Sequence, residues 1–193
     1  MFNKKKTIME QEKTNSGMSY FRIKTEWVSE RDNGMLEKIK TEELVLASSY
    51  TEAEQVAYAI SENNKRGNYG NVSFEIIKTK IADILYSDIL SMGITLSNGL
   101  VENYFEENED SGVGLYAVKI LNFFLDEKTG KVKRSPSTIH LPAVSNSDAA
   151  SKVTNYMKGS LTDYVIRDIK FDKAEAIYWP QETFKNKMSN PYI

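Results

Sequence analysis

The stretch that decides the fold is Leu125-Asp126-Glu127-Lys128-Thr129-Gly130-Lys131-Val132-Lys133-Arg134, which has the pattern of a β-hairpin turn. An apolar run over residues 116–125 precedes it, Thr129-Gly130 stands at the tip, and a basic arm returns. Glycine accepts the positive φ angles of tight turns, and such turns between apolar runs are typical of hairpins. The pattern therefore predicts two antiparallel strands joined here.

A second hairpin of the same kind is predicted earlier in the chain, with Asp32-Asn33-Gly34 at its tip. Between Tyr20 and Val28, apolar and polar residues partly alternate, which is the period of a strand with one buried face. The returning arm runs over residues 35–47. The two hairpins indicate that one building block is used twice.

Each hairpin precedes a predicted helix and then a further strand. Thr51-Glu52-Ala53-Glu54 fits a capping box, in which the hydroxyl and the glutamate satisfy backbone N–H groups at the helix start. This helix is expected to end before Gly67, and a strand is expected over residues 72–86. A second helix is predicted from Ser147 to about Lys158, and a last strand over residues 164–179.

The two halves correspond at a shift of 96 residues, which carries Tyr20 to Tyr116 (116 − 20), Gly34 to Gly130 and Ser49 to Ser145. We therefore predict an α+β fold of two tandem β-β-α-β repeats. Their antiparallel sheets are expected to be related by a pseudo-twofold axis, with the helices packed on one face. One such unit cannot bury its apolar face alone, so the two units should share a core. The pattern leaves open one continuous sheet or two packed sheets.

These predictions divide the chain into five parts that form one compact unit. They are a disordered tail (1–18), a first repeat (19–86), a linker or insertion (87–114), a second repeat (115–180) and a loose C-terminal tail (181–193). The linker is rich in glycine, holds the acidic run Glu106-Glu107-Asn108-Glu109-Asp110, and has room for a short hairpin or helix.

Composition sets limits on the function. The net charge of −2 provides no global field that favours nucleic acid or acidic lipid, so a polyanion site would have to be a local patch. The absence of cysteine excludes disulfides, cysteine-bound zinc and thiol catalysis. The N-terminus lacks the apolar core of a signal peptide, and no apolar run approaches a membrane span. We expect a cytoplasmic protein without membrane partners.

No catalytic constellation is predicted, and no enzyme activity or cofactor is expected. The single histidine, His140, has Ser135 and Ser137 nearby, but the three share one strand arm and alternate in direction. Gly112-Val113-Gly114 lacks the remainder of a dinucleotide-binding fingerprint. The carboxylates Glu106, Glu107, Glu109 and Asp110 lack the glycine and spacing of a calcium loop, so no metal site is expected.

Basic residues mixed with aromatic residues on the predicted strands form the candidate site. Sheets that hold single-stranded nucleic acid use this combination, because cations neutralise phosphates and rings stack on bases. In addition to the nearby rings of Phe21 and Tyr116, the predicted nucleic-acid-binding residues are Arg22, Lys24, Trp27, Lys38, Lys40, Lys119, Phe123, Lys128, Lys131, Lys133 and Arg134. The ligand would be single-stranded DNA or RNA.

A protein-interaction, assembly or regulatory module is the alternative. Basic residues on exposed strands also prevent unwanted edge pairing, and Trp27 and Phe123 suit a core equally well. The two hypotheses differ in what they predict. Nucleic-acid binding should weaken as salt rises, whereas the alternative predicts a defined protein partner or a homo-oligomer.

The chain also resembles a known family. The matching residues are Lys38-Ile39-Lys40-Thr41-Glu42, then Leu44-Val45 and Tyr50-Thr51-Glu52-Ala53-Glu54, and later Leu125-Asp126-Glu127-Lys128-Thr129-Gly130-Lys131. Over about residues 20–178 it is similar to an uncharacterised domain of unknown function from gut anaerobic bacteria and their phages. The resemblance implies a cytosolic bacterial or phage protein and supplies no catalytic residues. The 87–114 insertion and both tails depart from the family pattern.

Overall fold

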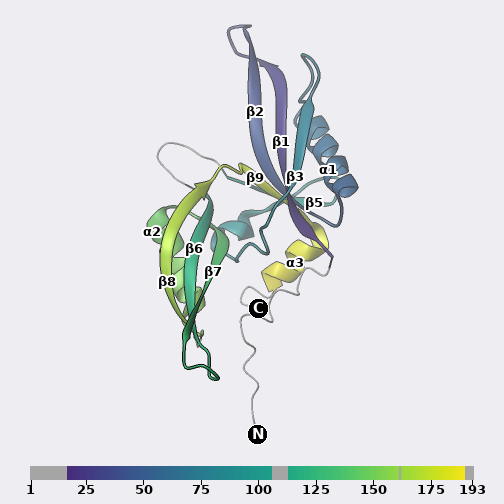
Figure 1. Cartoon of the computed structure of the whole chain (residues 1–193). Coiled ribbons are helices and arrows are strands. Elements are labelled where there is room, and N and C mark those ends of the chain that lie inside the picture. The colour runs from purple at the N-terminus through teal and green to yellow at the C-terminus, as the bar shows by residue number, and fades with distance from the viewer. Residues whose placement is uncertain (1–16, 106–112, 161, 190–193) are drawn as a thin grey trace.

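The structure is a computed structural model that describes residues 17–105, 113–160 and 162–189. It has the predicted mixed α+β architecture, with strands in two separate sheets and the long hairpins pointing to opposite ends of the molecule (Figure 1). The predicted N-terminal tail falls largely outside the described residues, and so do the last four residues of the predicted C-terminal tail and the acidic run at 106–110.

The larger sheet has six strands in the order β3-β1-β2-β9-β5-β4. Their bounds are β1 Ser19–Glu30, β2 Leu36–Ala47, β3 Ser73–Lys78, β4 Ile94–Thr95, β5 Leu100–Tyr104 and β9 Ala176–Pro180. The first predicted hairpin is present, because β1 and β2 pair antiparallel from Ser19↔Ala47 to Glu30↔Leu36. The predicted strand over 72–86 is too long, since β3 ends at Lys78.

The smaller sheet has three strands in the order β7-β6-β8. Their bounds are β6 Gly114–Leu125, β7 Val132–Ala143 and β8 Asp163–Asp172. The second predicted hairpin is also present, paired from Gly114↔Ala143 to Leu125↔Val132. A bulge in the β6–β8 ladder falls between Lys119 and Ile120.

Helix α1 (Tyr50–Asn63) follows the first hairpin and α2 (Asn146–Met157) follows the second. Both begin earlier than predicted. The α1 N-cap is Ser49, whose Oγ accepts from the Glu52 backbone N–H at 3.2 Å, and Ser145 accepts from Asp148 in the same way at 3.1 Å. The Ser-x-x-acidic spacing around Ser49 therefore overrides the Thr51–Glu54 pair, because strand β2 ends at Ala47 and the chain turns at once.

The strand orders β3-β1-β2 and β8-β6-β7 place equivalent elements alike, with a helix between the second and third strand of each unit. The shift is not constant, however. From the hairpin registers, Ala47 corresponds to Ala143 at 96 residues, but Ser19 corresponds to Gly114 at 95 (114 − 19). The second turn is one residue longer and absorbs the difference, so Tyr20 aligns with Leu115 and not with Tyr116. A common origin and a twofold axis stay predictions.

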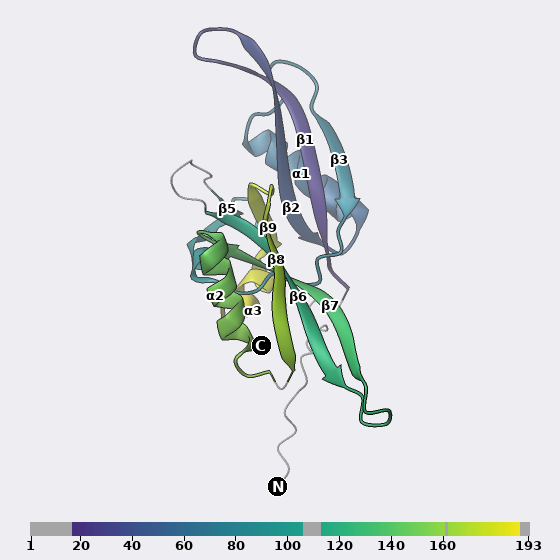
Figure 2. The same ribbon diagram turned by 60° about the vertical axis from the view of Figure 1, so that its left-hand side comes forward.

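The last predicted strand is two strands in different sheets. After β8 the chain crosses to the larger sheet, where β9 runs parallel to β2. In the opposite direction, the segment after β3 reaches the smaller sheet, where Ile84 forms a parallel bridge with His140 of β7. Figure 2 shows β9 leaving the β6-β7-β8 unit to lie beside β2.

The predicted linker and C-terminal tail contain regular structure. The 3-10 helix η2 (Asp88–Met92) and the short β4–β5 hairpin lie in the linker, and β5 pairs with β9. Residues 181–189 form helix α3 (Gln181–Ser189), where a loose tail was predicted. Its Phe184 and Met188 pack on the core around Trp179, and this contact holds the segment in place. Within the described ranges, no helix is long and apolar enough to cross a membrane.

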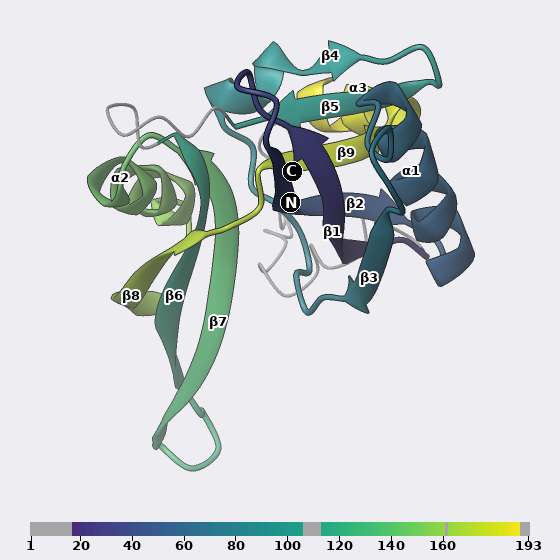
Figure 3. The ribbon, with the colours of Figure 1, turned by 90° about the horizontal axis from the view of Figure 1, so that it is seen from above.

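Three apolar clusters hold the fold together. Ala53, Ala57 and Ile60 of α1 cover one face of the larger sheet, and Ala149, Val153 and Met157 of α2 cover one face of the smaller. A third cluster joins the two sheets and includes Tyr20, Leu44, Leu115 and Trp179. The two halves therefore share a core, as predicted. Their strands form two sheets and not one continuous sheet. Helix α3 lies against the face of the larger sheet away from α1. Figure 3 shows the two units next to each other, with α2 beside β8 and β6 and α1 beside β2 and β3.

Candidate functional site

The predicted binding residues of the first hairpin lie on opposite faces of the sheet. Phe21 and Ile23 face α1, so Trp27, which is in phase with them, also lies on that face. Arg22 and Lys24 alternate with these residues and lie on the other face, as do Lys38 and Lys40 according to the β1–β2 register. The predicted combination of Trp27 with these four cations on one surface is therefore wrong. Phe21 is buried in the core and offers no ring to a ligand.

Carboxylates pair with all four predicted cations of the first hairpin. Lys24 pairs with Glu75 at 3.1 Å, and both Lys38 and Lys40 pair with Glu26. Hydrogen bonds from Lys38 and then Lys40 lower the pKa of Glu26 below its usual value. Paired cations are poorly placed to gain from phosphate, because each new contact must replace an existing one.

Arg22 is structural, since it joins the two units. Its Nη1 donates to Glu42 at 3.0 Å and its Nη2 donates to Asp172 of β8 at 2.7 Å. The side chain is only 18% exposed, and that of Asp172 is 13% exposed. A partly buried arginine with two carboxylates in fixed geometry has little freedom to bind a further anion.

The second hairpin keeps part of the predicted site together. Phe123 of β6 stands directly opposite Arg134 of β7, and the Arg134 guanidinium lies 6.0 Å from the centroid of the Phe123 ring. Both lie on what we call the open face, the face of β7-β6-β8 away from α2. Lys119 lies on this face as well, 3.9 Å from Asp168. Tyr116 lies under α2 and is buried, so it does not contribute.

The three lysines at the second turn differ from one another. Lys133 is on the α2 side and pairs with Asp126 at 2.6 Å, which lowers the pKa of Asp126. Lys128 and Lys131 are exposed in the turn itself, and within the described residues no carboxylate lies within 4.0 Å of either. The turn thus provides two unpaired cations beside the Phe123–Arg134 pair.

The serines near His140 do not form a catalytic arrangement with it. Ser137 Oγ accepts a hydrogen bond from Asn122 at 3.0 Å, which ties it to the neighbouring strand β6. His140 is half-buried beside the charges of Asp172 and Arg22, and its burial lowers its pKa. Among the described residues, no group of three histidine, aspartate or glutamate side chains could hold a metal ion.

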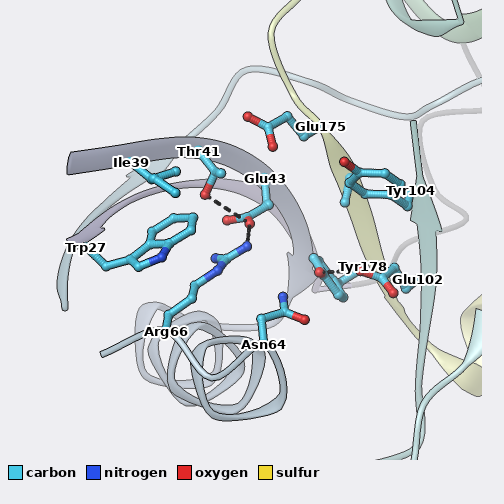
Figure 4. Close-up of a pocket in the computed structure, with 11 residues that line it drawn as sticks. Trp27, Ile39, Thr41, Glu43, Asn64, Arg66, Glu102, Tyr104, Glu175 and Tyr178 are labelled. Carbon is cyan, nitrogen blue, oxygen red and sulfur yellow. Dashed lines mark hydrogen bonds and ion pairs between the residues drawn. The ribbon is translucent and has the colours of Figure 1, made fainter. Parts of the chain in front are cut away.

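The structure contains a pocket that the sequence analysis missed. It has a volume of about 350 Å³ and lies where the end of α1 meets strands β2, β9 and β5 (Figure 4). The polar and aromatic lining residues are Trp27, Thr41, Glu43, Asn64, Arg66, Glu102, Tyr104, Glu175 and Tyr178. The alternation of side chains in β1, which places Trp27 and Arg22 on opposite faces, was the sequence pattern that could have indicated which face Trp27 lines. The lining residues from β5 and β9 could not be predicted from the sequence.

A buried ion pair forms one wall of this pocket. Arg66 Nη2 donates to Glu43 at 2.5 Å, and their side chains are 8% and 2% exposed. Thr41 donates to the same carboxylate at 3.1 Å, and the Arg66 guanidinium lies 4.5 Å from the centroid of the Trp27 ring. The Arg66 Nε and Nη1 atoms are buried without an acceptor within the described part of the chain. Each buried donor left without an acceptor costs about 1–3 kcal/mol, so stability alone does not account for this wall.

The opposite wall is aromatic and acidic. Tyr178 donates to Glu102 at 2.6 Å, and burial, followed by this hydrogen bond, raises the pKa of the Tyr178 hydroxyl. Tyr104 is 61% exposed at the rim. Glu175 is anchored by its backbone, which donates to Glu42 at 2.8 Å and accepts from Phe105 at 2.7 Å. Carboxylates and tyrosine rings therefore make up this side of the pocket.

Fold and sites together define a two-sheet α+β protein with an open sheet face and a polar pocket. The chain belongs to the family described as Domain of unknown function (DUF4494), whose model matches residues 19–181. This confirms the resemblance to a domain of unknown function. No curated protein and no solved structure matches the chain significantly.

Proposed function

We propose that this protein is a non-enzymatic binding protein for single-stranded DNA or RNA, which it holds on the open face of β7-β6-β8 and the turn of the second hairpin. The observation that carries the proposal is the Phe123–Arg134 pair, a ring and a guanidinium next to each other on the face of the sheet away from α2. Bases stack on rings and guanidinium planes, while neighbouring cations neutralise the backbone.

The balance of charge favours the second hairpin over the first. In the first, Glu26, Glu42 and Glu75 pair with the cations of the sheet face. In the second, the described residues place no carboxylate within ion-pair distance of Lys128, Lys131 or Arg134. Unpaired cations gain the full benefit of releasing counterions from a phosphate backbone. We therefore restrict the proposed site to Phe123, Lys128, Lys131 and Arg134, and leave out Lys119 because it pairs with Asp168 at 3.9 Å.

The test is a titration of labelled single-stranded oligonucleotide at low and high salt. We expect micromolar binding at low salt that weakens steeply as salt rises. The triple substitution of Lys128, Lys131 and Arg134 by alanine should abolish it, and Phe123→Ala should weaken it. The matched control is the triple substitution of Lys24, Lys38 and Lys40, which removes the same charge from the paired hairpin. Absent or salt-independent binding, or equal losses in both triple variants, would contradict the proposal.

A protein-interaction or assembly module is the second candidate, and a specific observation favours it. The ends of both hairpins carry exposed apolar side chains: Met35 and Leu36 are 63% and 60% exposed, and Leu125 and Val132 are 68% and 59% exposed. Exposed apolar groups at corresponding places suit contacts with a second copy or another protein. Light scattering distinguishes the two candidates. A stable oligomer that nuclease does not affect, and that is lost in the Leu36→Ser and Leu125→Ser double variant, would favour assembly.

We further propose, from the family resemblance, a bacterial or phage origin and a cytoplasmic location. The proposed tandem repeat is consistent with this compact fold, since its two units are too small to stand alone. Fractionation of expressing cells tests the location, and recovery of the protein in the membrane or secreted fraction would contradict it.

A further inference from the structure

We propose that the pocket lined by Arg66 and Glu102 binds a neutral planar molecule of the guanine type, a ring that accepts hydrogen bonds at one edge and donates them at another. The site is separate from the open face. Its walls come from the larger sheet and from the segments after α1 and before β9, whereas the open face belongs to the smaller sheet. The inference therefore does not depend on the nucleic-acid proposal.

The buried donors of Arg66 call for a ligand that accepts hydrogen bonds. The Arg66 side chain is only 8% exposed, and its Nη2 donates to Glu43. Its Nε and Nη1 are buried and have no acceptor anywhere in the described ranges. Figure 4 shows the guanidinium at the wall of the pocket, between Trp27 and Glu43. Buried polar groups nearly always have a partner, so an acceptor that enters from the pocket would complete this wall.

The charge of the lining indicates that this acceptor is neutral. Three carboxylates line the pocket, those of Glu43, Glu102 and Glu175, together with the guanidinium of Arg66. Because Glu43 already pairs with Arg66, a carboxylate or phosphate group would bring negative charge beside negative charge. A cation, in turn, would leave the donors of Arg66 without an acceptor. The fitting group is a carbonyl oxygen or an unprotonated ring nitrogen.

Glu102 requires that the same ligand also donates. Tyr178 donates to the Glu102 carboxylate at 2.6 Å, and a carboxylate has about four acceptor positions, so N–H groups of a ligand can bind there as well. Figure 4 shows Glu102 and Tyr178 on the side of the pocket away from Arg66. The ligand should therefore have an accepting edge for Arg66 and a donating edge for Glu102.

A guanine base has both edges. Its O6 and N7 atoms accept hydrogen bonds, and the N–H groups of its Watson–Crick edge donate them, whereas adenine carries an amino group in place of O6 and would turn a donor towards Arg66. Trp27 and Tyr178 line the same pocket, and bases stack on aromatic rings. The volume of about 350 Å³ lies at the lower end of the range of ligand pockets, roughly 300–1,000 Å³, which suits a molecule of this size.

The experiment is calorimetric titration of the full chain with guanosine, with adenosine as the comparison. We expect saturable binding of guanosine, tighter than that of adenosine by about tenfold or more. Because guanosine is uncharged, its binding should change little with salt, unlike the binding of an oligonucleotide to the open face. Failure of one proposal is thus distinguishable from failure of the other.

Arg66→Lys tests the donors directly. Lysine keeps a cation for Glu43 but lacks the Nε and Nη1 donors, so guanosine binding should fall about tenfold or more. The matched control is Arg31→Lys, because Arg31 pairs with Glu37 at the exposed end of the first hairpin and the variant should bind as the wild type does.

Glu102→Gln provides a second variant, which retains an acceptor for Tyr178 and removes the charge-assisted bond to the ligand. It should weaken guanosine binding several-fold with an unchanged unfolding midpoint. Its control is Glu75→Gln, an exposed glutamate that pairs with Lys24 and does not line the pocket.

A guanine base can come from a free nucleoside or from a nucleic-acid strand, and a trinucleotide with guanine between two adenines distinguishes these sources. We expect guanosine to bind more tightly, because the carboxylates of the lining repel phosphates. Tighter binding of the trinucleotide would support the same ring chemistry with a base in a strand as the ligand. Three outcomes would overturn the proposal: no binding of guanosine at millimolar concentration, equal affinities for guanosine and adenosine, or affinities in both pocket variants equal to those in their controls.

Discussion

Ile84 forms a parallel bridge with His140, and this contact corresponds to the pair that Leu44 forms with Ile177 in the larger sheet. His140 follows Leu44 by 96 residues (140 − 44), and Ile177 follows Ile84 by 93 (177 − 84). In each unit, therefore, the segment after the third strand leaves its own sheet and lies parallel to the second strand of the other. The halves are joined by a reciprocal exchange as well as by a common core.

The exchange predicts that Ile84 and Ile177 both stabilise the whole fold. Both are fully buried in the cluster that joins the sheets. Ile84→Ala and Ile177→Ala should each lower the free energy of unfolding by about 2–5 kcal/mol, from lost burial and the cavity left behind. Urea unfolding measures the change. As a control, Ile94→Ala at a position 64% exposed should change it by less than about 0.5 kcal/mol. A small effect at Ile84 would mean that the segment after β3 is not part of the core.

Local sequence patterns predicted the hairpins and helices, whose conformation depends on residues close together in the chain. Alternation in the segment from Tyr20 and the Asn33-Gly34 turn were sufficient for the first hairpin, and an apolar stripe was sufficient for α1. The similarity of Ile84-Leu85-Tyr86 to Ala176-Ile177-Tyr178 is visible in the sequence. The strand with which each of these segments pairs is determined by contacts between residues about 50 to 130 positions apart. No local sequence pattern encodes such contacts.

The candidate site was predicted less well, for a physical reason. Successive side chains of a strand point to opposite faces of the sheet. Trp27 therefore lies on one face and Arg22 and Lys24 on the other, although all three belong to β1. The Phe123–Arg134 pair was recovered because hairpin register brings opposite residues together. Salt bridges such as Lys24–Glu75 link strands that are far apart in the sequence, and the composition alone gave no sign of them.

Arg22 is predicted to contribute much more to stability than Lys24. Arg22→Met would leave Glu42 and the mostly buried Asp172 without their cation, and we expect a loss of about 2–4 kcal/mol. Lys24→Met removes an exposed pair with Glu75 and should cost less than about 1 kcal/mol. Chemical denaturation of both variants tests this. Similar losses in the two would show that Arg22 does not tie the units together.

The Glu43–Arg66 pair is predicted to show strong coupling. Arg66→Met leaves the carboxylate of Glu43, only 2% exposed, uncompensated, and should cost about 3–5 kcal/mol. Adding Glu43→Gln should restore much of that loss, because a neutral amide is far less costly to bury and can still accept from Thr41. A double-mutant cycle by urea unfolding measures the coupling. Additive effects would contradict a direct buried pair.

His140 should make stability depend on pH in a way that can be isolated, because it is the only histidine of the chain. Burial, the largest cause, lowers its pKa from the ordinary 6.5; Asp172 acts in the opposite direction, and Arg22 adds to the lowering. The folded state therefore holds the ring neutral at pH values where the unfolded chain binds a proton. Its contribution is fully present above about pH 6.5 and declines as pH falls through that value toward the lower folded pKa.

Urea unfolding at several pH values between 5 and 8 checks this expectation. The wild type should lose stability on acidification below pH 6.5, with a slope from this group of at most about 1.4 kcal/mol per pH unit. His140→Gln removes the titrating ring, and its stability should fall less over the same range, while carboxylates titrate alike in both proteins. Equal slopes would mean that His140 has the same proton affinity folded and unfolded, so that its place between the two sheets leaves it as hydrated as it is in the unfolded chain.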